Sequence, residues 1–505
     1  MIDDCRHRFS RPRDRRVETA LAGVAALFLA ACGEGSDYAA IADAPVIVPQ
    51  TLAATRSTLV TPPTPTGLFV NPAYDDATGD TSAYIGWDSA PGATGYRVRY
   101  KINGGTLHVN TVGATPGTQL TGLSPGDQLT VTVVAFSSGG LSSATDPVNA
   151  TLPHARTTAE DTNYNNAADY SEEASNGGVA VVVLQHGRKV FERYADGYNN
   201  EPHILASGTK SFSCALEAFA EQDGFLNLTT NVSSRITDWQ SDPDKSPITV
   251  LHLLGLNSGM HGNPAYSPRT VPTLDTYNLA VNEIDSGNPA GGNAFIYDPL
   301  SFQNFALLFQ ISSGGTYGSG GAVTGGTDPV DYLQTKLFTP LGIASTSYGW
   351  TRDVQGHPQM AGGASFSATD WLKYGQFMLQ KGTWQSARHL PAATVDYCTA
   401  GTGTGGYTNP SFHGYGLTWW LNRHYDGTYD DDVDIVPAAA LPIDPDDDQI
   451  APDVPEDMYM AAGAGFQRLY VIPSLDLVVV RFADDSASSD YSDNIFLGKL
   501  IGTVS

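Results

Sequence analysis

The C-terminal two thirds of the chain begins and ends with apolar runs of strand length. These runs form two pairs, 179–184 with 190–194 and 469–473 with 477–482, and each pair flanks turn residues. Such a pattern is typical of β-hairpins. Three stretches between the pairs repeat apolar residues at helical spacing: 211–223, 301–310 and 367–381. Strands at both ends with helices between them predict an α+β fold, in which a central antiparallel sheet packs against helices.

Residues 64–153 carry a different pattern, in which short alternating apolar runs are separated by Gly, Pro, Asp and Ser. This spacing predicts an all-β sandwich. Trp87 is expected to fill the space between the two sheets, with Tyr96 packed on it. Alternate residues of the last long strand are expected to point inward: Val131, Val133 and Ala135.

The same segment resembles a fibronectin type III domain over nearly its full length. The resemblance rests on residues 83–87, 91–100 and the turn 123–126. Leu129 stands where that family usually has a tyrosine whose hydroxyl bonds back to the main chain. Because the segment has no cluster of catalytic residue types, we expect a spacer, with carbohydrate or surface binding as the alternative.

Residues 1–31 have the features of an export signal. An Arg-rich start precedes the apolar run 20–31, which is too short to span a bilayer, since that needs about 20 apolar residues. The run ends in Leu-Ala-Ala followed by Cys32 and Gly33, which resembles the lipobox of bacterial lipoproteins. The resemblance implies that Cys32 is acylated and that, in a Gram-negative host, the protein is retained at the outer membrane. Cleavage by an ordinary signal peptidase is the alternative.

Two further segments lack strand or helical period. Residues 32–63 are rich in Ala, Thr and Pro and are expected to form a disordered tether. Residues 154–176 are rich in Asn, Asp and Glu and are expected to link the sandwich to a C-terminal domain at 177–505.

The chain carries 53 acidic residues against 27 basic ones. This excess repels phosphate backbones and argues against a nucleic-acid partner.

The cysteines are considered in view of the oxidising compartment that export implies. There are four, of which Cys5 leaves with the signal and Cys32 would carry lipid. Cys214 and Cys398 remain, in a compartment that favours disulfides. They could form a single disulfide or stay as two buried free thiols.

Ser207 and Lys210 form the only Ser-x-x-Lys in the chain. The tetrapeptide precedes an apolar-periodic stretch and is therefore predicted to open a helix, where residues three apart share a face. Serine needs a neighbouring base to act as a nucleophile, and a lysine can be that base when burial favours its neutral form. A capping serine beside a solvated lysine is the structural alternative.

Two more stretches, 251–260 and 362–375, complete a resemblance of about 330 residues to the class C β-lactamase superfamily. That superfamily also holds D-alanyl-D-alanine peptidases, family VIII esterases and 6-aminohexanoate oligomer hydrolases. The resemblance implies a β-lactamase/transpeptidase-like α/β/α fold. It also implies a serine hydrolase that acts through an acyl-enzyme on Ser207, with no metal or organic cofactor.

The family's second and third motifs match only in part. Tyr297 corresponds to the tyrosine of Tyr-x-Asn and would share proton transfer with Lys210, but Pro299 replaces the asparagine. Residues 461–464 occupy the place of Lys-Thr-Gly, and the N–H of Ala464 would pair with that of Ser207 as an oxyanion hole. Because this third motif offers no cation or hydroxyl to a substrate carboxylate, we expect an uncharged small ester or amide.

Residues 426–457 are strongly acidic. A solvated insertion is the plain interpretation, and a pocket rim that disfavours anionic substrates is the sharper hypothesis. Calcium binding is possible, although the spacing of an EF-hand is absent.

The sequence therefore predicts an exported, lipid-anchored serine hydrolase preceded by a fibronectin type III domain. A β-lactamase or D-alanyl-D-alanine carboxypeptidase is the first alternative. The second is a surface binding protein whose hydrolase domain is inactive.

Overall fold

The computed structural model describes two folded domains. The described residues are 60–74, 78–154, 156–260, 266, 271–283, 290–291, 295–401, 406–410, 412–424, 449–484 and 491–504. The predicted signal at 1–31, the lipidation site Cys32, the tether up to residue 59 and the acidic residues 426–448 lie outside them. Among the described residues, no helix has the length and apolar character needed to cross a membrane.

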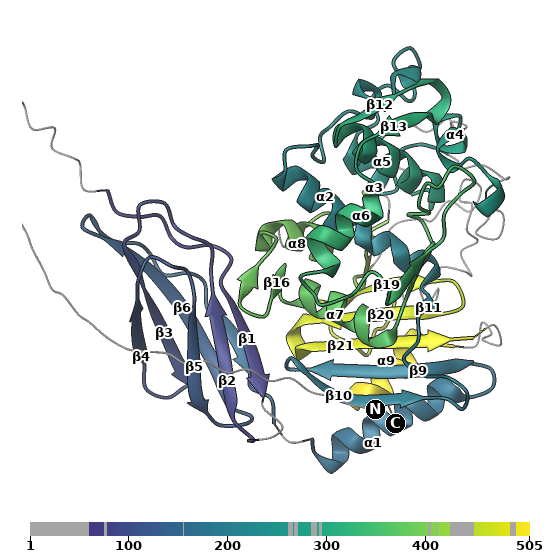
Figure 1. Cartoon of the computed structure of the whole chain (residues 1–505). Helices are drawn as coiled ribbons and strands as arrows, with labels where there is room; N and C mark the ends of the chain where they lie inside the picture. Colours follow the sequence, from purple (N-terminus) through teal and green to yellow (C-terminus); the bar gives the residue numbers. More distant parts are fainter. Residues whose placement is uncertain are drawn as a thin grey trace, which may run out of the picture. The chain divides into compact units, whose positions relative to one another are not determined.

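The N-terminal domain consists of two antiparallel sheets (Figure 1), which confirms the predicted sandwich. One sheet has the order β1-β2-β5, and the other has the order β4-β3-β6-β7 with β8 paired to β6. The strands are β1 (Phe69–Tyr74), β2 (Thr81–Gly86), β3 (Gly95–Ile102), β4 (His108–Val112), β5 (Thr118–Leu123), β6 (Gln128–Ser137), β7 (Gly140–Leu141) and β8 (Val148–Thr151).

The core of this domain is the predicted one. The rings of Trp87 and Tyr96 meet edge to face, with 5.1 Å between their centroids. The N–H of Ala90 donates to the buried Tyr96 hydroxyl at 2.9 Å, so this polar group is satisfied. Leu129 is fully buried and packs in the core. The three alternate residues of β6 that were expected to point inward are buried as well: Val131, Val133 and Ala135.

A six-stranded antiparallel sheet with the order β10-β9-β21-β20-β19-β18 forms the centre of the C-terminal domain. Its strands are β9 (Gly178–Gln185), β10 (Arg188–Tyr194), β18 (Trp420–Leu421), β19 (Tyr459–Gly463), β20 (Gln467–Ile472) and β21 (Leu477–Ala483). The first and last predicted hairpins are therefore adjacent, because β9 pairs with β21 in a register that places Val182 opposite Val480. Both apolar runs are buried on their two faces, which explains why they lack alternation.

Helices cover both faces of this sheet (Figure 1). On one face, α7 (Ala368–Leu379) packs so closely that a Cβ on its Gly375 would lie 2.5 Å from a side-chain carbon of Val478. On the other face lie α1 (Thr158–Glu172) and α9 (Asp493–Ile501), and Ser171 of α1 accepts a hydrogen bond from Arg481 at 2.9 Å. The predicted α/β/α arrangement is confirmed.

Helix α1 occupies residues that were expected to be a linker. A capping box starts it, because Thr157 and Glu160 exchange hydrogen bonds between side chain and main chain. Five of its residues are buried, and four of them form a stripe with the spacing i, i+3, i+4 and i+7: Tyr164, Ala167, Ala168 and Ser171, with Tyr170 beside it. Two alanines and a serine give little apolar signal, so the helical stripe was hidden among polar neighbours.

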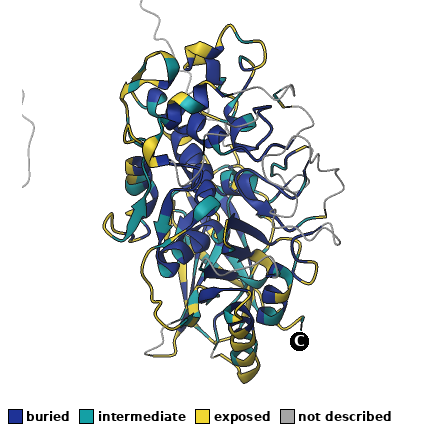
Figure 2. Ribbon diagram, turned by 90° about the vertical axis from the view of Figure 1, so that its right-hand side faces the viewer, coloured by how far each residue is buried: buried dark blue, intermediate teal, exposed yellow. Residues whose placement is uncertain are grey.

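The remaining α-helices lie on the same side of the central sheet as α7 (Figure 1), and most of their residues are buried (dark blue in Figure 2). They are α2 (Phe212–Gln222), α3 (Val250–Leu254), α4 (Thr276–Val281), α5 (Pro299–Ser312), α6 (Pro329–Leu333) and α8 (Ala392–Thr399). Short strands connect them: β11 (His203–Ile204), β14 (Tyr348–Trp350) and β15 (Ala364–Phe366) in one sheet, and the hairpins β12 (Gly315–Tyr317) with β13 (Val323–Gly325) and β16 (Thr383–Trp384) with β17 (Ala387–Arg388).

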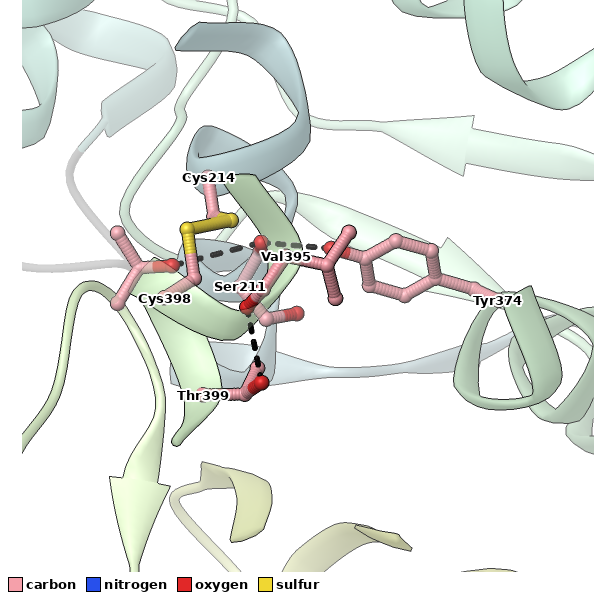
Figure 3. Close-up of a disulfide and its surroundings, with 7 residues drawn as sticks. Ser211, Cys214, Tyr374, Val395, Cys398 and Thr399 are labelled. Carbon is pink, nitrogen blue, oxygen red and sulfur yellow. Dashed lines mark hydrogen bonds between the residues drawn. A yellow bond between two sulfur atoms is a disulfide. The ribbon is translucent and has the colours of Figure 1, made fainter. Parts of the chain in front are cut away.

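A disulfide joins Cys214 of α2 to Cys398 of α8, 184 residues later (Figure 3). Close by, the hydroxyl of Tyr374 on α7 donates to the carbonyl oxygen of Ser211 at 2.7 Å. Three helices are therefore held together around the residue that precedes α2. Lys210 of the Ser-x-x-Lys motif stands directly before this point.

Replacing both Cys214 and Cys398 with alanine is expected to lower the free energy of unfolding of the C-terminal domain by about 2–4 kcal/mol, because the cross-link restricts the unfolded chain. Urea denaturation of the two proteins without reductant measures the difference. Wild-type protein unfolded with reductant should match the double variant. Equal midpoints in all samples would show that the two thiols are not paired.

Candidate active site

Ser207 and Lys210 lie in a 3₁₀ helix, Ala206–Ser211, that leads directly into α2. Residues i and i+3 stand above one another in a 3₁₀ turn, so the two side chains meet. The Lys210 Nζ donates to Ser207 Oγ at 3.0 Å and to the carbonyl oxygen of Ala361 at 2.8 Å. The predicted pairing of serine and lysine is therefore present, in a tighter helix than expected.

The Lys210 amine is buried, and this burial lowers its pKa to about 7, while the negative charge of Asp298 acts in the opposite direction. Two aromatic rings face the amine, at 4.8 Å for Tyr297 and 5.4 Å for Phe302 from Nζ to the ring centroid. Rings so placed favour the charged form and offset part of the loss of water. Near neutral pH the amine is thus available in both forms, as a group that takes up and returns a proton must be.

Tyr297 lies on the segment that enters α5, and only 9% of its surface is exposed. Burial raises its pKa to about 12, while a hydrogen bond with the Ser207 side chain and the charge of Arg468 act to lower it. The phenol is therefore protonated at neutral pH and contacts the same serine as Lys210. The structure brings together three of the predicted site residues: Ser207, Lys210 and Tyr297.

Asp298 follows Tyr297 and caps α5. Its carboxylate accepts the N–H groups of Leu300 at 2.9 Å and Ser301 at 2.6 Å, while Pro299 takes the first helical position. Burial raises the pKa of Asp298, and a hydrogen bond with the side chain of Glu283 acts in the opposite direction. We did not identify Asp298 from the sequence, although Asp-Pro before an apolar stretch is a signal for a helix start.

The third motif runs along β19 and ends beside the turn that carries Ser207. A Cβ on Gly463 would lie 2.0 Å from the carbonyl oxygen of Leu205, two residues before Ser207. Only glycine fits there, because the clash is with main chain. Ala464 follows at the exposed end of the strand. The strand thus approaches the Ser207 turn as the resemblance implied, with main-chain groups and no cationic side chain of residues 461–464.

The main chain before Ser207 is strained. Ala206 has a φ of 46°, in the left-handed region that is costly for a residue with a Cβ. Its carbonyl oxygen accepts the Thr209 hydroxyl at 2.7 Å, and that hydroxyl in turn accepts the N–H of Ala364 at 3.1 Å. A turn that is held in this way presents the serine in one fixed direction.

The two other family stretches support these groups. Residues 362–375 directly follow Ala361, whose carbonyl binds Lys210, and they include Trp371, which packs on Gly208 so that a Cβ there would lie 2.8 Å from its ring. In the stretch 251–260, Leu256 accepts the N–H of Ile296 at 3.0 Å next to Tyr297. The resemblance of these two stretches to the family is therefore explained by their contacts, which position the residues of the site.

A cluster of buried aromatic side chains surrounds Tyr297. Its members are Phe295, Phe412, Tyr415 and Trp420. The rings of Tyr415 and Trp420 lie 6.4 Å and 5.5 Å from that of Tyr297. Sequence spacing gives no sign of this cluster, because its members come from segments about 120 residues apart.

One group of carboxylates and imidazole in the described residues has a spacing that a metal ion could use: Asp275, Asp353 and His357. The Asp353 carboxylate already accepts the N–H and hydroxyl of Thr276, each at 2.8 Å, and lies 3.2 Å from His357 Nδ1. Asp275 caps α4 through the N–H of Asn278. These contacts show that the three side chains of the cluster stabilise α4 and the neighbouring loop.

Comparison with solved structures finds distant neighbours of the C-terminal domain. A putative 6-aminohexanoate-dimer hydrolase from Bacillus anthracis has 18% identity and a TM-score of 0.47, with 66% of this chain and 79% of that chain covered. A putative β-lactamase from Bacteroides dorei DSM 17855 has 16% identity and a TM-score of 0.49, with coverage of 67% and 96%. EstCE1, a hydrolase with promiscuous acyltransferase activity, has 14% identity and a TM-score of 0.47, with coverage of 69% and 100%. No curated protein matches the chain by sequence.

Two family models match the chain. The model of the fibronectin type III domain matches residues 71–151. The model named Beta-lactamase matches residues 165–501, which is about two thirds of the chain and includes the Ser-x-x-Lys segment and the strand beside it. The protein therefore belongs to the beta-lactamase family of serine hydrolases and carries a fibronectin type III domain in front of the hydrolase domain.

Proposed function

We propose that the protein is a serine hydrolase that cleaves an ester or amide bond through a covalent acyl-enzyme on Ser207. The observation that carries the proposal is the 3.0 Å contact between Ser207 Oγ and the buried Lys210 amine, whose pKa is lowered to about 7. A hydroxyl group becomes a useful nucleophile when a neutral amine accepts its proton. The mixed protonation of Lys210 at neutral pH supplies that amine.

In the first step, neutral Lys210 takes the proton of Ser207 as Oγ bonds to the substrate carbonyl carbon. The oxygen of that carbonyl gains the negative charge, and the N–H groups of Ser207 and Ala464 are the proposed donors to it. The phenol of Tyr297 then gives its proton to the leaving oxygen or nitrogen, and Lys210 restores the proton of Tyr297. Water repeats the sequence on the acyl-enzyme and releases the acid.

The substrate is proposed to be small and uncharged. β-Lactams and D-alanyl-D-alanine stems carry a carboxylate, and residues 461–464 have no side chain that would pair with it. Pro299, in the place of an asparagine, has no amide to bind an acylamide group. Binding such a carboxylate without a partner would lose much of its hydration energy.

Export with a lipid on Cys32 remains part of the proposal and rests on the N-terminal sequence. The disulfide between Cys214 and Cys398 supports an oxidising compartment. In this setting residues 32–63 act as a tether to the cell envelope and the fibronectin type III domain acts as a spacer or as a carbohydrate-binding or surface-binding module. An excess of acidic residues disfavours nucleic acid as a partner.

Protein lacking residues 1–32 is expected to hydrolyse p-nitrophenyl acetate or butyrate, and Ser207→Ala is expected to lower kcat by at least about 10³-fold because the nucleophile is lost. The rate of p-nitrophenolate release measures this. Labelling by a fluorophosphonate probe, present in wild type and absent in Ser207→Ala, confirms the reacting residue.

Turnover of nitrocefin faster than of the esters would show that the activity of the protein is that of a β-lactamase. No turnover of any of these substrates, together with no labelling of Ser207, would contradict the proposal and favour a surface binding protein with an inactive hydrolase domain.

The pH dependence provides a second test. Below its pKa of about 7 Lys210 is protonated and cannot accept the serine proton, so kcat/KM is expected to rise with pH through about 7. Asp298→Asn removes a negative charge that raises the pKa of Lys210, so the rise should move to lower pH. Asparagine also caps helices well, so α5 should be retained.

The measurement is kcat/KM for a neutral ester between pH 5 and pH 9 in both proteins. Asp370→Asn is a matched control, because Asp370 lies in the first turn of α7 and pairs with Lys373 instead of acting on Lys210. A profile that Asp298→Asn leaves in place, or moves to higher pH, would show that Lys210 is not the titrating base.

A further inference from the structure

The turn between β19 and β20 is fixed through its carbonyl groups. Arg468 on β20 donates from Nη1 to the carbonyl oxygens of Gly463 at 3.1 Å and Gln467 at 3.2 Å. The Gln467 side chain donates to the carbonyl oxygen of Gly465 at 2.9 Å. A loop at the exposed end of a strand would ordinarily leave these acceptors to water.

Arg468 is itself held rigidly. Its Nε lies 2.8 Å from Oδ1 of Asp493, and its Nη2 lies 3.3 Å from Oδ2, which is a two-point pairing of guanidinium and carboxylate. Both residues are more than nine tenths buried, and the Tyr470 hydroxyl also donates to Asp493. Asp493 is the first residue of α9, so the guanidinium is anchored to a helix behind the sheet.

A second arginine acts on the same turn. Arg481 on β21 stands opposite Arg468 in the strand register. It donates from Nη1 to the carbonyl oxygen of Phe466 at 2.9 Å and from Nε to Ser171 of α1 at 2.9 Å. Two buried guanidinium groups on the α1 and α9 face therefore hold three carbonyl groups of residues 463–467.

The Gly463 carbonyl has a special place among them. It belongs to the same planar peptide group as the N–H of Ala464, and in a trans peptide these two bonds point in opposite directions. Fixing the Gly463 oxygen on the Arg468 side therefore fixes the direction of the Ala464 N–H, away from Arg468. Gly463 packs against the main chain that leads to Ser207, so this peptide group lies beside the nucleophile.

We propose that Arg468, held by Asp493, is a positioning residue that orients and polarises the Gly463–Ala464 peptide so that its N–H serves as an oxyanion donor. This inference rests on the proposed function and names the machinery behind one of its donors. A cation at the carbonyl end of a peptide draws electron density toward that oxygen and strengthens the N–H as a donor.

The need for such a device follows from the third motif of this chain. In the place of the Lys-Thr-Gly motif of the resembled family, residues 461–464 supply only methyl groups and main chain. The strand end must therefore be placed by groups from behind it. A purely structural role, as a buried ion pair that stabilises β20 and α9, is the alternative explanation.

The test compares an oxygen ester with the matching thiono ester, in which sulfur replaces the carbonyl oxygen, for Arg468→Lys and Asp493→Asn. Sulfur accepts hydrogen bonds weakly, so hydrolysis of the thiono ester depends little on the oxyanion donors. Loss of one such donor costs about 10²–10³-fold in other serine hydrolases. We expect kcat/KM for the oxygen ester to fall by about 10–100-fold, with little change for the thiono ester and in KM.

The ratio of the two rates does not depend on the fraction of folded enzyme, so partial unfolding of a variant leaves the test valid. Arg352→Lys is the matched control, because Arg352 also pairs with a carboxylate, Asp328, and donates to a main-chain carbonyl, that of Gly356. It should keep the wild-type ratio.

A parallel loss of both rates in the Arg468 and Asp493 variants would overturn the inference and leave a structural ion pair. If the wild-type protein hydrolyses neither ester, the proposed function on which the inference rests is refuted instead. The two failures are therefore distinguished by the protein in which they are seen.

Discussion

The site depends on the burial of one amine. Lys210 has almost no contact with water, which disfavours its ammonium form, and the neighbouring groups compensate for only part of the lost hydration free energy. The carbonyl of Ala361 accepts from the amine, the ring of Tyr297 faces it, and the charge of Asp298 acts on it. Burial and the opposing charge of Asp298 together bring the pKa to about 7, well below that of a solvated lysine. A deeper or a more exposed position would remove one of the two protonation states that acyl transfer needs.

The fold serves this amine by joining distant segments. Strands from both ends of the hydrolase domain pair in the sheet, so β19 and β20 reach the turn of Ser207 although more than 250 residues separate them. Gly463 can pack on Leu205 because the strand has no side chain there. Helix α9 then supplies Asp493 behind the sheet. In the proposed arrangement, the helical layer on the far side of the sheet from Ser207 acts on the site through the backbone of the middle layer.

Local patterns account for what the sequence predicted. Ser207 and Lys210 are three residues apart, and their meeting is a property of one helical turn. The hairpins and helices α2, α5 and α7 were visible as apolar runs and periods. Helix α1 was missed because the stripe that it buries consists mainly of small side chains such as Ala167 and Ala168. The roles of Asp298 and Arg468 were missed for a different reason: each depends on the position of a partner that sequence spacing does not give.

Arg468 also bears on the charge of the substrate. A guanidinium close to the third motif could be taken as a replacement for the cation that relatives use to bind a carboxylate. Its donors, however, are occupied by Asp493 and by the carbonyls of Gly463 and Gln467, and its charge is balanced by Asp493 within the protein. Releasing it toward a ligand would leave a buried carboxylate unpaired, which costs several kcal/mol. Under the proposed function, the positive charge therefore acts on a peptide group of the protein itself, which supports the proposal of an uncharged substrate.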